Sequence, residues 1–153
     1  MNMKRLIIAL ALIMSTAASF AQREFIDHFG NVDGITSIYV SKTMIRLLPK
    51  LDAGNMDLKK ISQKLESVQI LTSESTKAAS RLRKGCQELF KRDSYEPLME
   101  VKESGKDSAT IYLRELSKGR NSYVIFAGDD TDLSVIVITG TISVEDIQSI
   151  TEK

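Results

Sequence analysis

The stretch LSVIVITGTISVEDIQSI, Leu133 to Ile150, places an apolar strand directly before a segment with the features of a helix. Val135 and Val137 lie on one face of the predicted strand, and isoleucines occupy the opposite face, because side chains alternate along a strand. A strand that is apolar on both faces has to be covered on both sides, either by helices or by a second subunit.

The glycine at the end of this strand, Gly140, raises the question of a phosphate site. A P-loop needs two glycines followed by Lys and Ser or Thr, and a dinucleotide fold needs three spaced glycines. Here Gly140 stands alone, Ser143 is a good helix N-cap, and Glu145 and Asp146 lie in the first helical turn. Carboxylates at that position are favoured by the helix dipole but would repel a phosphate. The junction is therefore predicted to have a structural role as scaffold, connecting a strand to a final helix over Val144–Ile150, and not to bind a phosphate.

Three other strand-like runs precede this one, LMEVKE, ATIYLRE and SYVIFAG. The connecting segments SGKDS, LSKGRN and DDTD are short and rich in turn-forming residues. Short connections of this kind join antiparallel neighbours, so the C-terminal part predicts a four-stranded meander.

The N-terminal half alternates short helices with strands. A helix over Phe25–Phe29 ends at Gly30, and a strand is predicted over Ile35–Val40 from its β-branched and aromatic residues. A strand over Val68–Thr72 leads to the longest helix, Glu74–Arg92. Two more short helices are expected between the strands: one capped by Ser41, with Met44, Ile45 and Leu48 on its apolar face, and one capped by Asp57, with Leu58, Ile61 and Leu65. This order predicts an α+β fold with a mainly antiparallel sheet and helices packed on it.

The first residues, MNMKRLIIALALIMSTAASFAQ, have the pattern of a secretory signal peptide. Two basic residues precede the apolar run Leu6–Met14, and Ser19 and Ala21 fit the −3 and −1 positions of a cleavage site. The run is shorter than the roughly 20 apolar residues that span a bilayer. We therefore expect residues 1–21 to be removed near Ala21, leaving 22–153 as a single domain that is exported to the periplasm or beyond.

Few residues are available for chemistry. His28 and Cys86 are the single histidine and cysteine, which excludes an internal disulfide and a two-histidine metal site. His28 has no G-x-S-x-G partner motif, and Cys86 lies on the apolar stripe of the long helix, where we expect a buried, inert thiol. The run DDTD lacks the twelve-residue ligand pattern of an EF-hand and predicts a hairpin turn. We predict no catalytic, cofactor-binding or metal residues.

Charge gives one candidate surface. The chain carries 21 basic and 20 acidic residues, a near-neutral balance that gives no global reason to bind nucleic acid. On the long helix, Lys77, Arg81 and Lys84 belong to a basic face, which is either simply solvated or docks on an anionic lipid or protein surface. Together with Val135 and Val137, should helices leave that sheet face open, these residues form the predicted interaction surface.

Several segments resemble the domain-of-unknown-function 4252 family: FIDHFGNVDGITSIYVSKTMIRLLP, VQILTSES, YEPLMEVKESG and VIVITGTISVEDI. The resemblance implies a small exported protein of Bacteroidota, many of them lipoproteins, with no assigned activity. It further implies a gene neighbourhood of extracytoplasmic sigma and anti-sigma factors, and so an envelope-sensing or regulatory role. This chain lacks a cysteine at the cleavage point, which departs from the lipoprotein pattern.

Three functional hypotheses follow from these observations. The first is a non-enzymatic exported protein-interaction or regulatory module that binds a partner of the cell envelope or itself. The alternative is a periplasmic small-ligand or lipid binder with a pocket between the sheet and the long helix. An enzyme comes third, because it would require carboxylates such as Glu96 and Glu100, or His28 with a distant acid, to converge in a cleft. No cofactor and no transmembrane helix are predicted for the mature chain.

Overall fold

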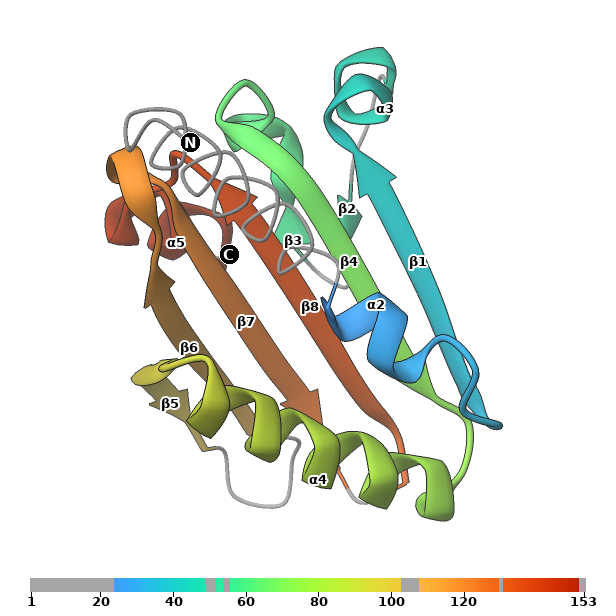
Figure 1. The fold of residues 1–153 in the computed structure, drawn as a ribbon. Helices are drawn as coiled ribbons and strands as arrows, with labels where there is room; N and C mark the ends of the chain where they lie inside the picture. Colours follow the sequence, from blue (N-terminus) through green and yellow to red (C-terminus); the bar gives the residue numbers. More distant parts are fainter. Residues whose placement is uncertain (1–23, 49–51, 54–55, 103–107, 130, 152–153) are drawn as a thin grey trace, which may run out of the picture.

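A six-stranded antiparallel sheet forms the centre of the molecule, and its strands follow the order β1-β4-β8-β7-β6-β5 (Figure 1). The computed structural model describes residues 24–48, 52–53, 56–102, 108–129 and 131–151. The last four strands form the predicted meander, and β4 lies between β8 and β1. The strands of this sheet are β1 (Ile35–Ser41), β4 (Leu65–Ser73), β5 (Glu96–Val101), β6 (Ser108–Glu115), β7 (Asn121–Gly128) and β8 (Leu133–Gly140).

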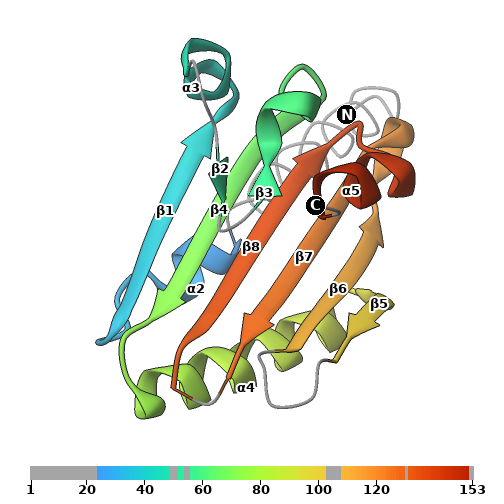
Figure 2. The same cartoon turned by 180° about the vertical axis from the view of Figure 1, so that it is seen from behind.

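Helices cover both faces of this sheet (Figures 1 and 2). On one face lie α2 (Glu24–Phe29) and the long helix α4 (Thr76–Arg92), which carries the chain from β4 to the far edge strand β5. On the other face lie α5 (Val144–Thr151), the 3₁₀ helix η1 (Leu58–Ile61) and α3 (Lys42–Leu47). The α+β fold predicted from the sequence is confirmed.

Each face of the sheet has its own apolar core, which explains the two-sided pattern of the last strands. On the α4 face, Val135 and Val137 pack with Leu82, Cys86 and Leu89 of the helix. Both valines are buried, with 0% and 2% of their surface exposed. Because α4 and α2 cover this face, the condition under which Val135 and Val137 would form an open interaction surface is not met.

The opposite core lies under α5. Ile136 and Ile138 of β8 pack with Tyr123 of β7 and with Ile147 and Ile150 of α5. The segment before α5 is held to the sheet by two hydrogen bonds, because the carbonyl oxygen of Ile142 accepts one from the Tyr123 hydroxyl and one from the Asn121 side-chain amide, each at 2.9 Å.

The predicted helix caps at Ser41, Asp57 and Ser143 are confirmed. Ser41 Oγ accepts from the Met44 amide at 3.3 Å, and Asp57 Oδ1 accepts from the Lys59 amide at 3.0 Å. Ser143 and Asp146 form a reciprocal capping box, in which each side chain accepts from the other residue's amide at 3.0–3.1 Å.

The structure explains why a glycine occupies position 140, which the sequence alone does not. The chain passes so close to β4 at this point that a Cβ on Gly140 would collide with the carbonyl oxygen of Lys64. That carbonyl accepts from the Thr141 amide at 3.1 Å, next to an irregularity in the β4–β8 pairing between Leu65 and Ser67. The glycine therefore permits a close approach of two strands, as the scaffold interpretation requires.

Three local predictions differ from the structure. Leu65 begins β4 and does not continue the preceding helix, which is a short 3₁₀ turn. Met44 is 49% exposed, so of the predicted apolar face only Ile45, which is buried, and Leu48, which is partly buried, pack against the core. A two-stranded pair, β2 (Asp52–Ala53) with β3 (Met56–Asp57), was not anticipated, because two residues per strand leave no periodicity to detect.

Residues 1–21, the predicted signal peptide, lie outside the residues that the structure describes. Within the described ranges, no helix is both long enough and apolar enough to cross a membrane.

Candidate functional site

The basic residues predicted for an interaction surface lie on the solvent side of α4. Lys77, Arg81 and Lys84 are exposed, on the helix face opposite the apolar stripe. Arg83 behaves differently, because its guanidinium lies 5.5 Å from the centre of the Phe126 ring and donates to the carbonyl oxygen of Asp129 at 3.2 Å. The structure thus separates the exposed basic face from Val135 and Val137, which are buried beneath the helix and do not join it in one surface.

The candidate reactive residues are dispersed. His28 is exposed at the end of α2, near β1, with its ring against Phe29 at 4.7 Å between centroids. Glu96 and Glu100 are exposed on β5, at the opposite edge of the sheet (Figure 1). Cys86 is fully buried, and burial raises the pKa of its thiol to about 12. The fold does not bring these side chains into one cleft.

The acidic hairpin uses its charge to hold its own turn. Asp129 Oδ1 accepts from the Thr131 amide and hydroxyl and from the Asp132 amide, all at 2.8 Å. These hydrogen bonds lower the pKa of Asp129. Among the described residues, no group of three or more His, Cys, Asp or Glu side chains is placed to hold a metal ion.

The two edges of the sheet differ in their protection. The edge strand β5 contains Pro97 and two glutamates, and its pairing with β6 is irregular between Pro97 and Met99. Charged residues, prolines and bulges are the usual means by which proteins prevent an edge from pairing with another chain. The other edge strand, β1, has the sequence ITSIYVS, without charge or proline, and its pairing with β4 is regular from Ile35 to Ser41.

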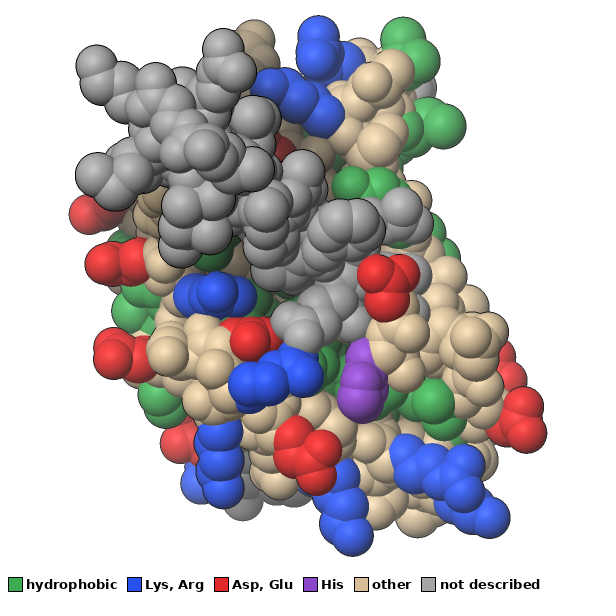
Figure 3. Space-filling view, viewed as in Figure 1, with side chains coloured by type: hydrophobic (Ala, Val, Ile, Leu, Met, Phe, Trp, Pro, Cys, Tyr) green, Lys and Arg blue, Asp and Glu red, His purple; other side chains and the backbone are tan. Residues whose placement is uncertain are grey.

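Apolar side chains stand beside the unprotected edge. Ile38, at the centre of β1, is 50% exposed, and Leu47 and Met44 of α3 are 73% and 49% exposed. Figure 3 shows hydrophobic side chains at the surface where α3 lies. We call β1 together with α3 the β1 edge surface. The local sequence pattern predicts both elements, but their exposure depends on β1 being the outermost strand of the sheet.

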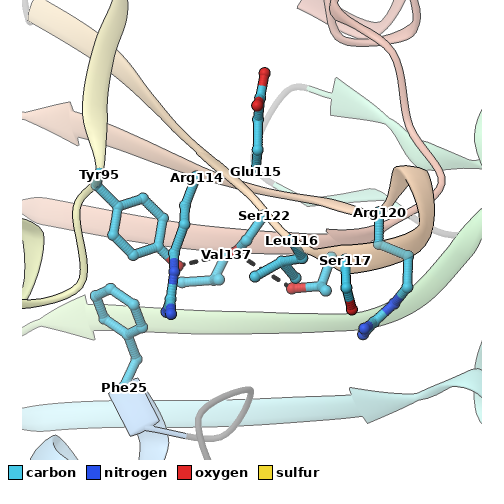
Figure 4. Close-up of a pocket in the computed structure, with 10 residues that line it drawn as sticks. Phe25, Tyr95, Arg114, Glu115, Leu116, Ser117, Arg120, Ser122 and Val137 are labelled. Atoms are coloured by element: carbon cyan, nitrogen blue, oxygen red, sulfur yellow. Dashed lines mark hydrogen bonds between the residues drawn. The ribbon is translucent and has the colours of Figure 1, made fainter. Parts of the chain in front are cut away.

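A pocket of about 270 Å³ opens on the α4 face of the sheet, beyond the C-terminal end of α4. We call it the Arg114 pocket. Figure 4 shows Tyr95 and Arg114 reaching into the same space from the α4–β5 loop and from β6. Its lining combines apolar, hydroxyl and charged side chains: Phe25, Tyr95, Arg114, Glu115, Leu116, Ser117, Arg120, Ser122, Val137 and Thr139.

Hydroxyl groups line the floor of this pocket. The Tyr95 hydroxyl and Ser122 Oγ are 2.9 Å apart, and Thr139 Oγ1 donates to Ser122 Oγ at 3.4 Å. Burial raises the pKa of Tyr95, opposed in part by the Ser122 hydrogen bond and the Arg114 charge, so the phenol stays protonated at neutral pH. The lining residues are far apart in the sequence, so no local motif marks this pocket.

The two arginines of the pocket differ in their partners. Arg120 forms a two-pronged pair with Glu66 of β4, with nitrogen–oxygen distances of 2.7–2.9 Å. Arg114 lies 5.9 Å from the centre of the Tyr95 ring and forms no ion pair with a carboxylate in the described part of the chain.

Comparison with protein families gives one match over most of the chain. The family model described as Domain of unknown function (DUF4252) matches residues 29–150. A comparison with curated proteins gives no match.

Proposed function

The chain belongs to the DUF4252 family, and from this premise we propose that it is a non-enzymatic interaction module that assembles with a second copy of itself through the β1 edge surface. Export is part of the proposal: residues 1–21 act as a signal peptide, and the domain from residue 22 onward works in the periplasm or outside the cell. The order of charge, apolar run and small residues in the first segment supports export.

The observation that carries the proposal is the contrast between the two sheet edges. Natural proteins protect an edge strand that is meant to stay unpaired, and β5 has such protection in Pro97 and its glutamates. The seven residues of β1 have none. An unprotected edge flanked by exposed apolar side chains is typical of a surface that another strand covers.

A second copy fits this edge by symmetry. The backbone amide of Glu74 donates to the carbonyl oxygen of Gly34 at 2.8 Å, and the same register places Thr36 opposite Thr72 and Ile38 opposite Ile70. Because hydrogen-bonded pairs alternate along antiparallel strands, the backbone groups of Ser37, between Thr36 and Ile38, point away from β4 and toward the open edge. Ile38 is the central residue of β1, so a two-fold axis beside it aligns the outward backbone groups of two identical strands.

The charge of the surface also fits self-association. Like charges directly opposite each other across a strand pair are destabilising. The strand β1 carries no charged residue, so two copies meet there without repulsion. Pairing would also cover Ile38 and bring the exposed side chains of α3 from the two copies toward the same junction.

Sedimentation velocity of the purified protein tests the proposal. We expect the mass of two chains for the natural protein and the mass of one chain for Ile38→Lys, because a lysine at the centre of each strand would place two like charges at the junction. The matched control is Val101→Lys on β5, where the natural side chain is similarly exposed, at 45% against 50% for Ile38. This control should keep the mass of two chains.

Two results would count against the proposal. One is a single-chain mass for the natural protein at every concentration, which would leave β1 open or reserve it for a different protein. The other is dissociation by Val101→Lys but not by Ile38→Lys, which would place the contact at the opposite edge. A dimer that turns over a substrate would contradict the non-enzymatic part.

The Arg114 pocket favours a second candidate function, the binding of a small ligand. Its volume of about 270 Å³ lies just below the usual range of ligand pockets, roughly 300–1,000 Å³. It would therefore accept a small molecule, and it lies on the α4 face, away from β1.

A further inference from the structure

We propose that the Arg114 pocket binds a small organic monoanion, whose carboxylate pairs with the Arg114 guanidinium and whose short apolar body lies against Phe25, Leu116 and Val137. This site is separate from the β1 edge surface, because none of its lining residues belongs to β1 or α3.

The charge of Arg114 is the first argument. A half-buried guanidinium loses part of its hydration, and proteins normally compensate that loss with a carboxylate. Arg120, in the same pocket, is compensated by Glu66. Arg114 has the aromatic face of Tyr95 but no carboxylate within ion-pair distance among the described residues, although Asp93 and Glu96 line a neighbouring surface hollow. Glu115 also lines the pocket, but Figure 4 shows its carboxylate directed away from Arg114.

The hydroxyl groups are the second argument. Tyr95, Ser122 and Thr139 form a connected set of donors and acceptors beside the guanidinium. A hydroxyl rotates to donate to an anion when one is present. On the adjacent strand, Ser67 pairs in register with Thr139, the residue is 2% exposed, and its buried Oγ has no hydrogen-bond partner in the described structure. A buried polar atom without a partner marks a polar space on this face of the sheet.

The size and charge of the pocket select the ligand class. A planar guanidinium matches a carboxylate with two parallel hydrogen bonds. One uncompensated positive charge balances one negative charge, whereas a phosphate dianion would leave excess negative charge near Glu66. Phe25, Leu116 and Val137 offer an apolar wall, so a carboxylate with a small ring or short chain should bind better than a bare ion.

Isothermal titration calorimetry with sodium benzoate tests the proposal, with benzamide as a neutral ligand of the same shape. We expect saturable one-to-one binding of benzoate, weaker binding of acetate, and none of benzamide. Arg114→Gln should weaken benzoate binding by about 10- to 100-fold, the loss expected for one charge-assisted pair. Arg114→Lys keeps the positive charge but lacks the planar guanidinium, so its affinity for benzoate should lie between that of the natural protein and that of Arg114→Gln. The control Arg81→Gln, on the exposed face of α4, should bind as the natural protein does.

The comparison of benzoate with benzamide needs no substitution, so it remains decisive even if Arg114→Gln fails to fold, which circular dichroism would reveal. Equal binding of benzoate and benzamide would overturn the proposal, as would a folded Arg114→Gln variant with unchanged affinity. Saturable binding of inorganic phosphate without binding of benzoate would also overturn it, and so would the absence of saturable heat at millimolar benzoate.

Discussion

The junction between β8 and α5 gives a quantitative test of the scaffold interpretation, through Gly140→Ala. The added Cβ would overlap the carbonyl oxygen of Lys64, a backbone atom that cannot rotate away. Overpacking of this kind costs about 1–3 kcal/mol, and a backbone neighbour places the cost near the upper end. Replacing glycine also removes disorder from the unfolded chain, which offsets about 0.4–1 kcal/mol. We expect a net destabilisation of about 2 kcal/mol.

Urea unfolding followed by circular dichroism measures this difference, and a loss of about 2 kcal/mol would lower the melting temperature by roughly 4–16 °C. Gly119→Asn is the control, because a Cβ at Gly119 has no neighbour within 4 Å and asparagine tolerates its φ of +70°. The control should stay within about 0.5 kcal/mol of the natural protein. A Gly140→Ala variant as stable as the natural protein would refute the close-approach argument.

Three further outcomes are expected. Tyr123→Phe and Asn121→Ala should each lower the free energy of unfolding in urea by about 0.5–1.5 kcal/mol. The double variant should lose more than the sum of these two values, because only then does the Ile142 carbonyl oxygen lose both of its donors; a loss equal to the sum would contradict this. The Cys86 thiol should react with a thiol reagent only as fast as the protein unfolds, because burial raises its pKa to about 12; a rate typical of a free thiol would contradict burial. Hydrogen bonds lower the pKa of Asp146 in the folded protein, so the ionised carboxylate stabilises the fold by about 1 kcal/mol above the ordinary carboxyl pKa. This stabilisation is lost as the pH falls through the lower pKa of the folded state, and an Asp146→Asn variant with an unchanged acid unfolding profile would contradict this.

Local chemistry made much of the fold predictable. The caps at Ser41 and Ser143 depend on residues three positions apart, so the sequence alone contains the information. The alternation in Leu133–Gly140 correctly required cover on both faces, since every side chain of a strand must face one layer or the other. The short loops of the meander likewise specified antiparallel neighbours.

The position of β1 and the composition of the pocket could not be predicted in this way. Strand β4 lies between β1 and β8, so that Val68 pairs with both Val40 and Ile138. These partners are far apart in the sequence, and no local pattern predicts their pairing. The exposure of Ile38 follows from that pairing. The Arg114 pocket joins residues from Phe25 to Thr139, so its chemistry exists only in the folded chain.

Amide hydrogen exchange at Ser37 tests assembly through β1 most directly. If the edge pairs with a second copy, this outward amide should be protected in a concentration-dependent manner in the natural protein and should lose protection in Ile38→Lys. The neighbouring amide of residue 38, in a pair with Ile70 inside the sheet, should stay protected in both proteins. A Ser37 amide that exchanges at the unprotected rate at every concentration, while residue 38 stays protected, would contradict the assembly.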